Sequence, residues 1–232
     1  MFAPRVPGGV GLAHERMRHV FVETNWVFAY AAPAHHKSLD AVELLQRARA
    51  GEVQLHLPSP CLTEARQAIL RKCQPRHEAD AVRQFLLRAR AERTVSPDQE
   101  RTTREVLGRF EQQVQVELRH LAETLEDLRG EGVQIFPLNA NMLERAVSLS
   151  TLDLSLKPFD QAILAAILVR AGELASVGEV DLCFCEADAD LQPWDKRGDP
   201  KQPLTDLYDA AGVWVYGDFD LREPERPDDW PG

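Results

Sequence analysis

The chain has 232 residues, of which 44% are hydrophobic, and a formal net charge of −10. This length and composition are typical of one large domain with a packed core. The acidic charge argues against a general nucleic-acid coat protein, and no apolar run is long enough to span a bilayer or to form a signal peptide. We therefore expect a cytoplasmic protein that has no membrane partner.

Composition divides the chain into three segments. Residues 1–17 are rich in Gly and Pro and predict a disordered arm, residues 18–220 form the domain, and the charged, Pro-rich residues 221–232 predict a tail that frays. The four cysteines contain no CxxC pair, so reduced core thiols are favoured over a structural zinc site.

A short apolar run, Val20 to Val22, predicts a buried strand, because it is β-prone and too short for a helix. Glu23 follows it, and Thr24 and Asn25 are expected as turn and helix-capping residues before the next helix. A carboxylate is thus expected at the carboxyl end of a buried strand, where open α/β sheets build their sites. Taken alone, Glu23 is better interpreted as an exposed residue at a strand end, and only the recurrence of this arrangement later in the chain favours a site.

The same arrangement recurs after a second predicted strand, Val53 to Leu57. Ser59-Pro60 is typical of an N-cap and a first helical position, and Glu64 falls about one turn into the helix that follows. Between the two strands, Ser38 is expected to cap another helix.

Residues 76–130 are almost entirely helix-forming, with a break at Ser96-Pro97. We expect two long helices, the second with an apolar stripe at spacings of three and four from Val106 to Leu128. Two interpretations of this pair stay open: a helical hairpin or clamp that projects from the core, and an ordinary packing layer.

Three further strands are predicted, at Val133 to Phe136, Leu182 to Cys185 and Val213 to Tyr216. Pro158 suits a first helical position, which puts Asp160 in the first turn of an almost wholly apolar helix. A favourable interaction with the helix dipole is the alternative explanation for Asp160. The alternation of strands and helices predicts right-handed crossovers and a mainly parallel five-stranded sheet in an α/β fold.

Because the carboxyl ends of parallel strands lie on one edge of a sheet, we expect four carboxylates to meet there. They are Glu23, Glu64, Asp160 and Asp188. Four carboxylates in one cleft repel one another unless a divalent cation or protons neutralise them. Oxygen ligands without His or Cys nearby favour Mg²⁺ or Mn²⁺.

These motifs resemble those of the PIN domain family of metal-dependent nucleases, over about residues 18–220. The family's first strand ends in Asp-Thr-Asn, and this chain has Glu23-Thr24-Asn25. The family's acidic residue early in the next helix is matched by Glu64, and its Asp at the start of an apolar helix by Asp160.

The family's fourth motif is a strand followed by Thr-x-Asp-x-Asp, and the corresponding residues here are Glu186, Asp188 and Asp190. Two residues depart from the family pattern. Glu23 keeps the charge of Asp and is one methylene longer, whereas Glu186 replaces a hydroxyl donor by a charge.

The resemblance implies a three-layer α/β/α sandwich in which the helices at about 76–130 are a long insertion. It also implies a ribonuclease that cleaves single-stranded or structured RNA with Mg²⁺ or Mn²⁺. The residues expected to be both catalytic and metal-binding are Glu23, Glu64, Asp160 and Asp188. Asp190 is the next candidate ligand, and Asn25 and Glu186 are expected to orient the ligands from behind.

The resemblance also implies a role as a toxin controlled by a separate antitoxin, although nothing in this chain encodes that partner. Another protein partner and a homodimer stay open as well.

The charge is unevenly distributed along the chain. Residues 64–104 contain ten Lys/Arg and six Asp/Glu, a charge of +4, whereas residues 181–232 contain five and fourteen, a charge of −9. At 100° per residue, Arg71 lies near the Glu64 face of its helix and Arg66 points away. We expect Arg71 and Lys72 to contact RNA phosphates, against the alternative of a solvated helix face.

A function from another class stays open: a binding module on a degenerate nuclease scaffold, which acts on RNA or protein through its helical hairpin. The features that favour it are Glu23, Glu186 and the apolar stripe of the second long helix. Binding of Mn²⁺ separates the two hypotheses.

Overall fold

The computed structural model of the protein describes residues 17–130, 132–178 and 180–227. Its centre is one sheet in which every neighbouring pair of strands is parallel. The strands are β1 (Arg18–Phe21), β2 (Val53–Pro58), β3 (Val133–Phe136), β4 (Asp181–Cys185) and β5 (Val213–Tyr216). The five strands and the parallel sheet that the sequence predicts are confirmed.

The strand order is β3-β2-β1-β4-β5. The chain first moves outward from β1 to β2 and β3, then crosses back to β4 and moves outward again to β5. The order therefore reverses between β1 and β4. Open α/β sheets bind their ligands in the crevice at the carboxyl ends of the strands at such a point.

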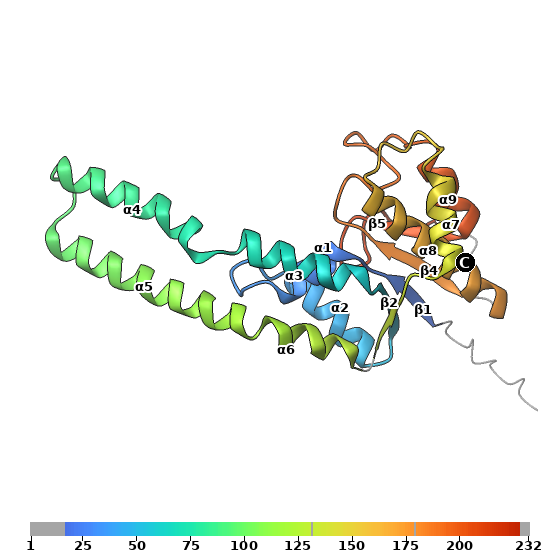
Figure 1. The fold of residues 1–232 in the computed structure, drawn as a ribbon, viewed down its shortest axis with the longest axis horizontal. Helices are drawn as coiled ribbons and strands as arrows, with labels where there is room; N and C mark the ends of the chain where they lie inside the picture. Colours follow the sequence, from blue (N-terminus) through green and yellow to red (C-terminus); the bar gives the residue numbers. More distant parts are fainter. Residues whose placement is uncertain (1–16, 131, 179, 228–232) are drawn as a thin grey trace, which may run out of the picture.

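Helices cover both faces of the sheet, which gives the three-layer α/β/α sandwich. In Figure 1, helices α1 to α3 gather on one side of the strands, and helices α7 to α9 on the other. Their bounds are α1 (Thr24–Ala31), α2 (Leu39–Arg49), α3 (Pro60–Lys72), α7 (Ala140–Leu149), α8 (Pro158–Val177) and α9 (Leu204–Ala211).

The core lies between these layers and includes the middle of α8. Pro158 is at the first position of this helix, as predicted, and Ile163 to Leu168 are buried, whereas Val177 in the last turn is exposed. Fully burying an aliphatic side chain such as Leu164 stabilises the fold by about 1.5–3 kcal/mol. No helix in the described residues is both long and apolar enough to cross a membrane.

Helix capping follows the sequence in one place and departs from it in another. The Ser38 hydroxyl accepts a hydrogen bond from the backbone N of Ala41 at 3.4 Å and so caps α2, as expected. Ser59 is at the N-cap position of α3 and Pro60 opens the helix, as predicted, but the Ser59 side chain makes no capping hydrogen bond with the described residues. Its φ and ψ angles, −57° and −31°, are already helical, whereas a capping residue is typically extended.

Residues 75–119 form a helical hairpin, which we call the arm, of α4 (Pro75–Ala91) and α5 (Pro97–Arg119). The break at Ser96-Pro97 is confirmed, with Ser96 and Gln99 in a reciprocal capping box. Figure 1 shows the arm projecting far from the sheet, as the hairpin interpretation requires.

The second long helix is shorter than predicted and does not reach Leu128. It ends at Arg119 and is followed by α6 (Leu121–Glu126) and a short 3₁₀ helix, η1 (Asp127–Arg129). The apolar stripe is divided at this point. Leu121, Leu125 and Leu128 belong to the main core, so the inner part of the insertion is a packing layer and only the outer part projects.

The structure describes only part of each predicted terminal segment. Of the expected disordered N-terminal segment, residues 1–17, all but Met17 lies outside the described residues. The described part of the tail, residues 221–227, is attached rather than frayed. The indole N of Trp214 donates to the carbonyl of Pro224 at 3.1 Å, and Arg226 pairs with Asp181.

Cysteine placement agrees with the expectation of core residues, since all four cysteines are buried.

Candidate active site

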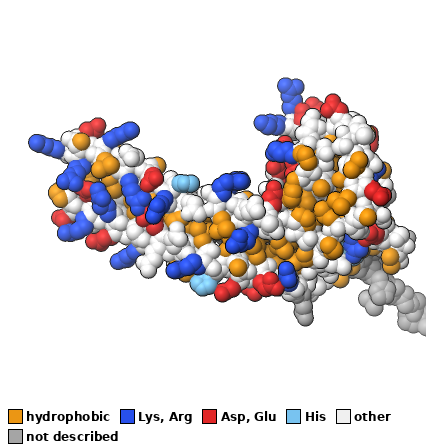
Figure 2. Space-filling model, in the orientation of Figure 1, with side chains coloured by type: hydrophobic (Ala, Val, Ile, Leu, Met, Phe, Trp, Pro, Cys, Tyr) orange, Lys and Arg blue, Asp and Glu red, His pale blue; other side chains and the backbone are white. Residues whose placement is uncertain are grey.

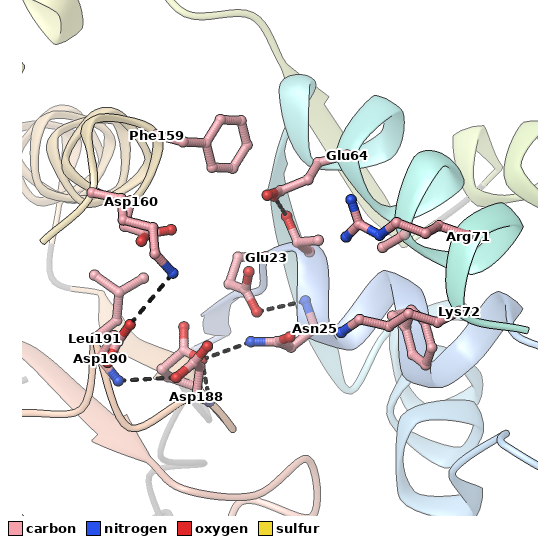
Figure 3. A pocket seen from close by; sticks show the side chains of 15 residues that line it. Glu23, Asn25, Glu64, Arg71, Lys72, Phe159, Asp160, Asp188, Asp190 and Leu191 are labelled. Carbon is pink, nitrogen blue, oxygen red and sulfur yellow. Dashed lines mark hydrogen bonds and ion pairs between the residues drawn. The ribbon is translucent and has the colours of Figure 1, made fainter.

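A pocket of about 290 Å³ opens at the carboxyl ends of β1 and β4. Figure 3 shows side chains from α3 on one side of it, residues from the start of α8 and the loop after β4 on the other, and Glu23 between them. The structure thus brings together every site residue that the sequence suggested: Glu23, Asn25, Glu64, Arg71, Lys72, Asp160, Glu186, Asp188 and Asp190.

Glu23 lies at the floor of the pocket and caps α1. Its Oε1 accepts a hydrogen bond from the backbone N of Asn25 at 2.6 Å, so Glu23, rather than Thr24 or Asn25, is the capping residue. Its side chain is only 6% exposed. Burial raises the pKa of Glu23 to about 7, against the hydrogen bond from Asn25 and together with the charge of Glu64.

Glu186 follows β4 directly and is completely buried. Its Oε1 accepts hydrogen bonds from the backbone N of Asp188 at 2.6 Å and from Nδ2 of Asn25 at 3.3 Å. Its Oε2 has no hydrogen-bond partner among the described residues. Burial, followed by the charge of Glu23, holds the pKa of Glu186 well above its ordinary value. The sequence did not predict that Glu186 is buried.

Glu64 reaches the pocket from the second turn of α3 and is half-buried. The hydroxyl of Thr24 donates to its Oε2 at 2.5 Å, which ties α1 to α3 across the pocket. We did not single out Thr24 as a site residue. The only signal in the sequence was a hydroxyl residue directly after Glu23.

Three aspartates line the opposite side. Asp160 is in the first turn of α8, and its pKa is raised by burial, against the lowering effect of Lys157. Asp188 and Asp190 are exposed on the loop after β4, where the backbone N of Asp190 donates to Oδ1 of Asp188 at 3.1 Å. Lys157 lies 3.9 Å from Oδ2 of Asp190.

Side-chain hydrogen bonds to backbone carbonyls hold the loop that carries Asp188 and Asp190. The side-chain amide of Gln192 donates to the carbonyl of Glu186 at 2.8 Å, and the buried Tyr208 hydroxyl donates to the carbonyl of Leu191 at 3.0 Å. The position of this side of the pocket is therefore set by contacts with α9 and with the loop itself.

The donor chemistry of the pocket fits a hard divalent cation. Its acidic donors are carboxylate oxygens, and none of Glu23, Glu64 or Glu186 forms an ion pair with another described residue. As they stand, however, no three His, Cys, Asp or Glu side chains among the described residues form a group that could hold a metal ion. The carboxylates line one space but would have to move together to share an ion.

Arg71 and Lys72 form a basic rim beside the acidic floor. Both are exposed and line the pocket from α3, whereas Arg66 does not line it, in agreement with the helical spacing. The Lys72 ammonium lies 5.6 Å from the ring centre of Phe28. Neither residue has an ion pair with another residue that the structure describes.

In comparisons with known proteins, no family model, curated protein or solved structure matches the chain. A function for this protein therefore has to be argued from the chemistry of the pocket.

Proposed function

We propose that the protein is a PIN-type ribonuclease that hydrolyses phosphodiester bonds of RNA with Mg²⁺ or Mn²⁺. The observation that carries the proposal is the convergence of carboxylates at the point where the strand order reverses, beside a basic rim. A cluster of this kind repels phosphate unless cations are bound, whereas with cations it attracts the substrate backbone. RNA also fits the exposed Arg71 and Lys72.

The proposed cation ligands are Glu23, Glu64, Asp160 and Asp188, with Asp190 as a further candidate. A bound divalent cation would supply an activated water and neutralise charge on the scissile phosphate. Asn25 holds the floor in place, because its backbone N binds Glu23 and its side-chain amide binds Glu186. Thr24 does the same for Glu64 through its hydroxyl.

The compartment that we propose is the cytoplasm. Cys61, Cys183 and Cys185 are buried free thiols, which fits a protein that has no need of disulfides.

The test is cleavage of labelled single-stranded and hairpin RNAs by the full chain, with Mn²⁺ or Mg²⁺ and with EDTA. We expect cleavage that requires metal and is lost in Asp160→Asn. Asp153→Asn, an exposed aspartate in the loop before α8, is the matched control and retains activity. Cleavage in EDTA, or no cleavage of any RNA with either metal, contradicts the proposal.

A second candidate function is an RNA- or protein-binding module without catalysis, favoured by the arm that projects from the body. No group of three ligands is preassembled in the described residues, which also fits a scaffold without metal. Calorimetric titration with Mn²⁺ separates the two functions, because the nuclease binds the metal and the scaffold does not.

A further inference from the structure

Glu23 and Glu186 lie at the same level of the sheet. β1 and β4 are neighbours, with Phe21 opposite Phe184 in the register of the two strands. Each glutamate stands two residues beyond one of these paired phenylalanines, Glu23 after β1 and Glu186 after β4. Both therefore enter the same pocket from neighbouring strands, where the strand order reverses.

One residue connects this pair. Asn25 donates its backbone N–H to Glu23 at 2.6 Å and its side-chain amide to Glu186 at 3.3 Å. With the backbone N of Asp188 at 2.6 Å, these bonds occupy Oε1 of each carboxyl group. Oε2 of Glu186 is buried and accepts no hydrogen bond from any residue that the structure describes.

A purely structural role does not account for this oxygen. Capping α1 explains Glu23, but Glu186 caps no helix and makes no ion pair with any described residue. Buried polar atoms are almost always hydrogen-bonded, and buried charges are paired or coordinate metals. Both carboxyl groups nevertheless line a pocket open to solvent, through which an ion can arrive.

We infer that Glu186 is a direct ligand of a divalent cation, which it holds together with Glu23 in an inner position between the ends of β1 and β4. Its Oε2 is the free donor, and Asn25 fixes the opposite oxygen of each carboxyl group. The carboxylates of α3, α8 and the loop, namely Glu64, Asp160 and Asp188, surround the outer part of the pocket. The cation class rests on the proposed function, but the assignment of Glu186 as a ligand does not follow from it.

The experiment is titration of the full chain with MnCl₂, followed by calorimetry and by the melting temperature with and without metal. Glu186→Gln keeps the size of the side chain and removes the charge. We expect it to bind Mn²⁺ about 100-fold more weakly. Loss of a residue that only orients a metal ligand costs about 10- to 100-fold, and loss of a direct ligand should reach the upper end of that range. We also expect its metal-free melting temperature to equal or exceed that of the wild type, because the cost of burying an ionisable carboxyl group is removed.

Glu52→Gln is the matched control, since Glu52 is exposed and precedes β2 at the opposite edge of the sheet. It binds Mn²⁺ like the wild type. If Glu186→Gln also binds Mn²⁺ like the wild type, or if the wild type binds none, Glu186 is not a cation ligand and the inference is overturned. If Glu186→Gln loses affinity but no RNA is cleaved, the cation site stands and the proposed nuclease function fails.

Discussion

The body and the arm of this protein carry charge in opposite ways. The body buries two carboxyl groups, Glu23 and Glu186, at the end of a tightly packed parallel sheet. The arm exposes its charges and joins its helices by ion pairs such as Arg83 with Glu111, at 2.5 Å. Exposed ion pairs contribute only about 0–1 kcal/mol each, so they add little to the packing of the two helices, which bury Leu86, Ala89 and Val114.

The difference shows where chemistry and recognition can be placed. Burying a carboxylate costs free energy, so the group stays buried only where the surrounding packing holds it in place. A cation site requires carboxylates that are held in this way. Exposed Lys and Arg side chains on a long hairpin cost little free energy of folding and tolerate substitution. This suits contact with a large partner. Figure 2 shows many Lys and Arg side chains along the visible face of the arm.

The largest effect that we predict concerns packing. Leu128 is fully buried in the main core, whereas Val106 on the arm is 61% exposed. Leu128→Ala should lower the free energy of unfolding by about 2–5 kcal/mol. Val106→Ala should change it by less than about 0.5 kcal/mol. Urea unfolding measures both, and similar losses would show that the arm and the body share one core.

A second prediction addresses the bridge between the two buried carboxyl groups. Asn25→Ala should weaken Mn²⁺ binding about 10- to 100-fold, because Glu186 loses the side-chain amide that orients it, whereas Glu23 keeps its backbone donor. The backbone N of Asn25 remains, so the loss reports mainly on the contact with Glu186.

The control for this variant is Asn139→Ala, which removes the cap that Asn139 makes to the backbone N of Met142 on α7. It should lower stability by about 1 kcal/mol without changing Mn²⁺ affinity. Equal affinities for the two variants would count against an orienting role for Asn25.

The third prediction is a dependence on pH. The folded-state pKa of Glu23, about 7, is above its ordinary value of 4.5, so the native state binds the extra proton between these values. The stability contributed by this proton is present below pH 4.5 and is lost as the pH rises through 7. Metal competes with the proton, so Mn²⁺ affinity should rise with pH by up to about tenfold per unit below pH 7.

Melting curves from pH 5 to 8, with and without Mn²⁺, measure both trends. Glu23→Gln should flatten the dependence of the metal-free melting temperature on pH. An unchanged profile in that variant would assign the titration to another group.

The smallest predicted effect concerns the basic rim. Arg71→Ala should weaken RNA binding and reduce the slope of log affinity against log salt by about 1, since one phosphate contact is lost. Arg66→Ala, on the same helix but outside the pocket, should do much less. Both are measured across a salt series at constant metal concentration. Equal effects would place the phosphate path on another element, the arm being the first to examine.

Local sequence determined much of the fold. Apolar runs such as Val20 to Val22 and helix-start residues such as Pro158 set the backbone conformation of the few residues around them. The five strands and the start of α8 were therefore correctly predicted. Because consecutive parallel strands end on one edge, the meeting of Glu23, Glu64 and Asp160 also followed from the order of elements.

Tertiary structure alone decided the rest. The helix after Pro97 has no strong breaker near His120, yet the chain bends there because Leu121 and Leu128 pack into the core while α5 extends beyond it. The burial of Glu186 likewise depends on its place beside β1, and a side chain next in sequence, Ala187, is exposed. Sequence specifies which groups are available, whereas burial, which sets their charge and their partners, arises only when distant strands come together.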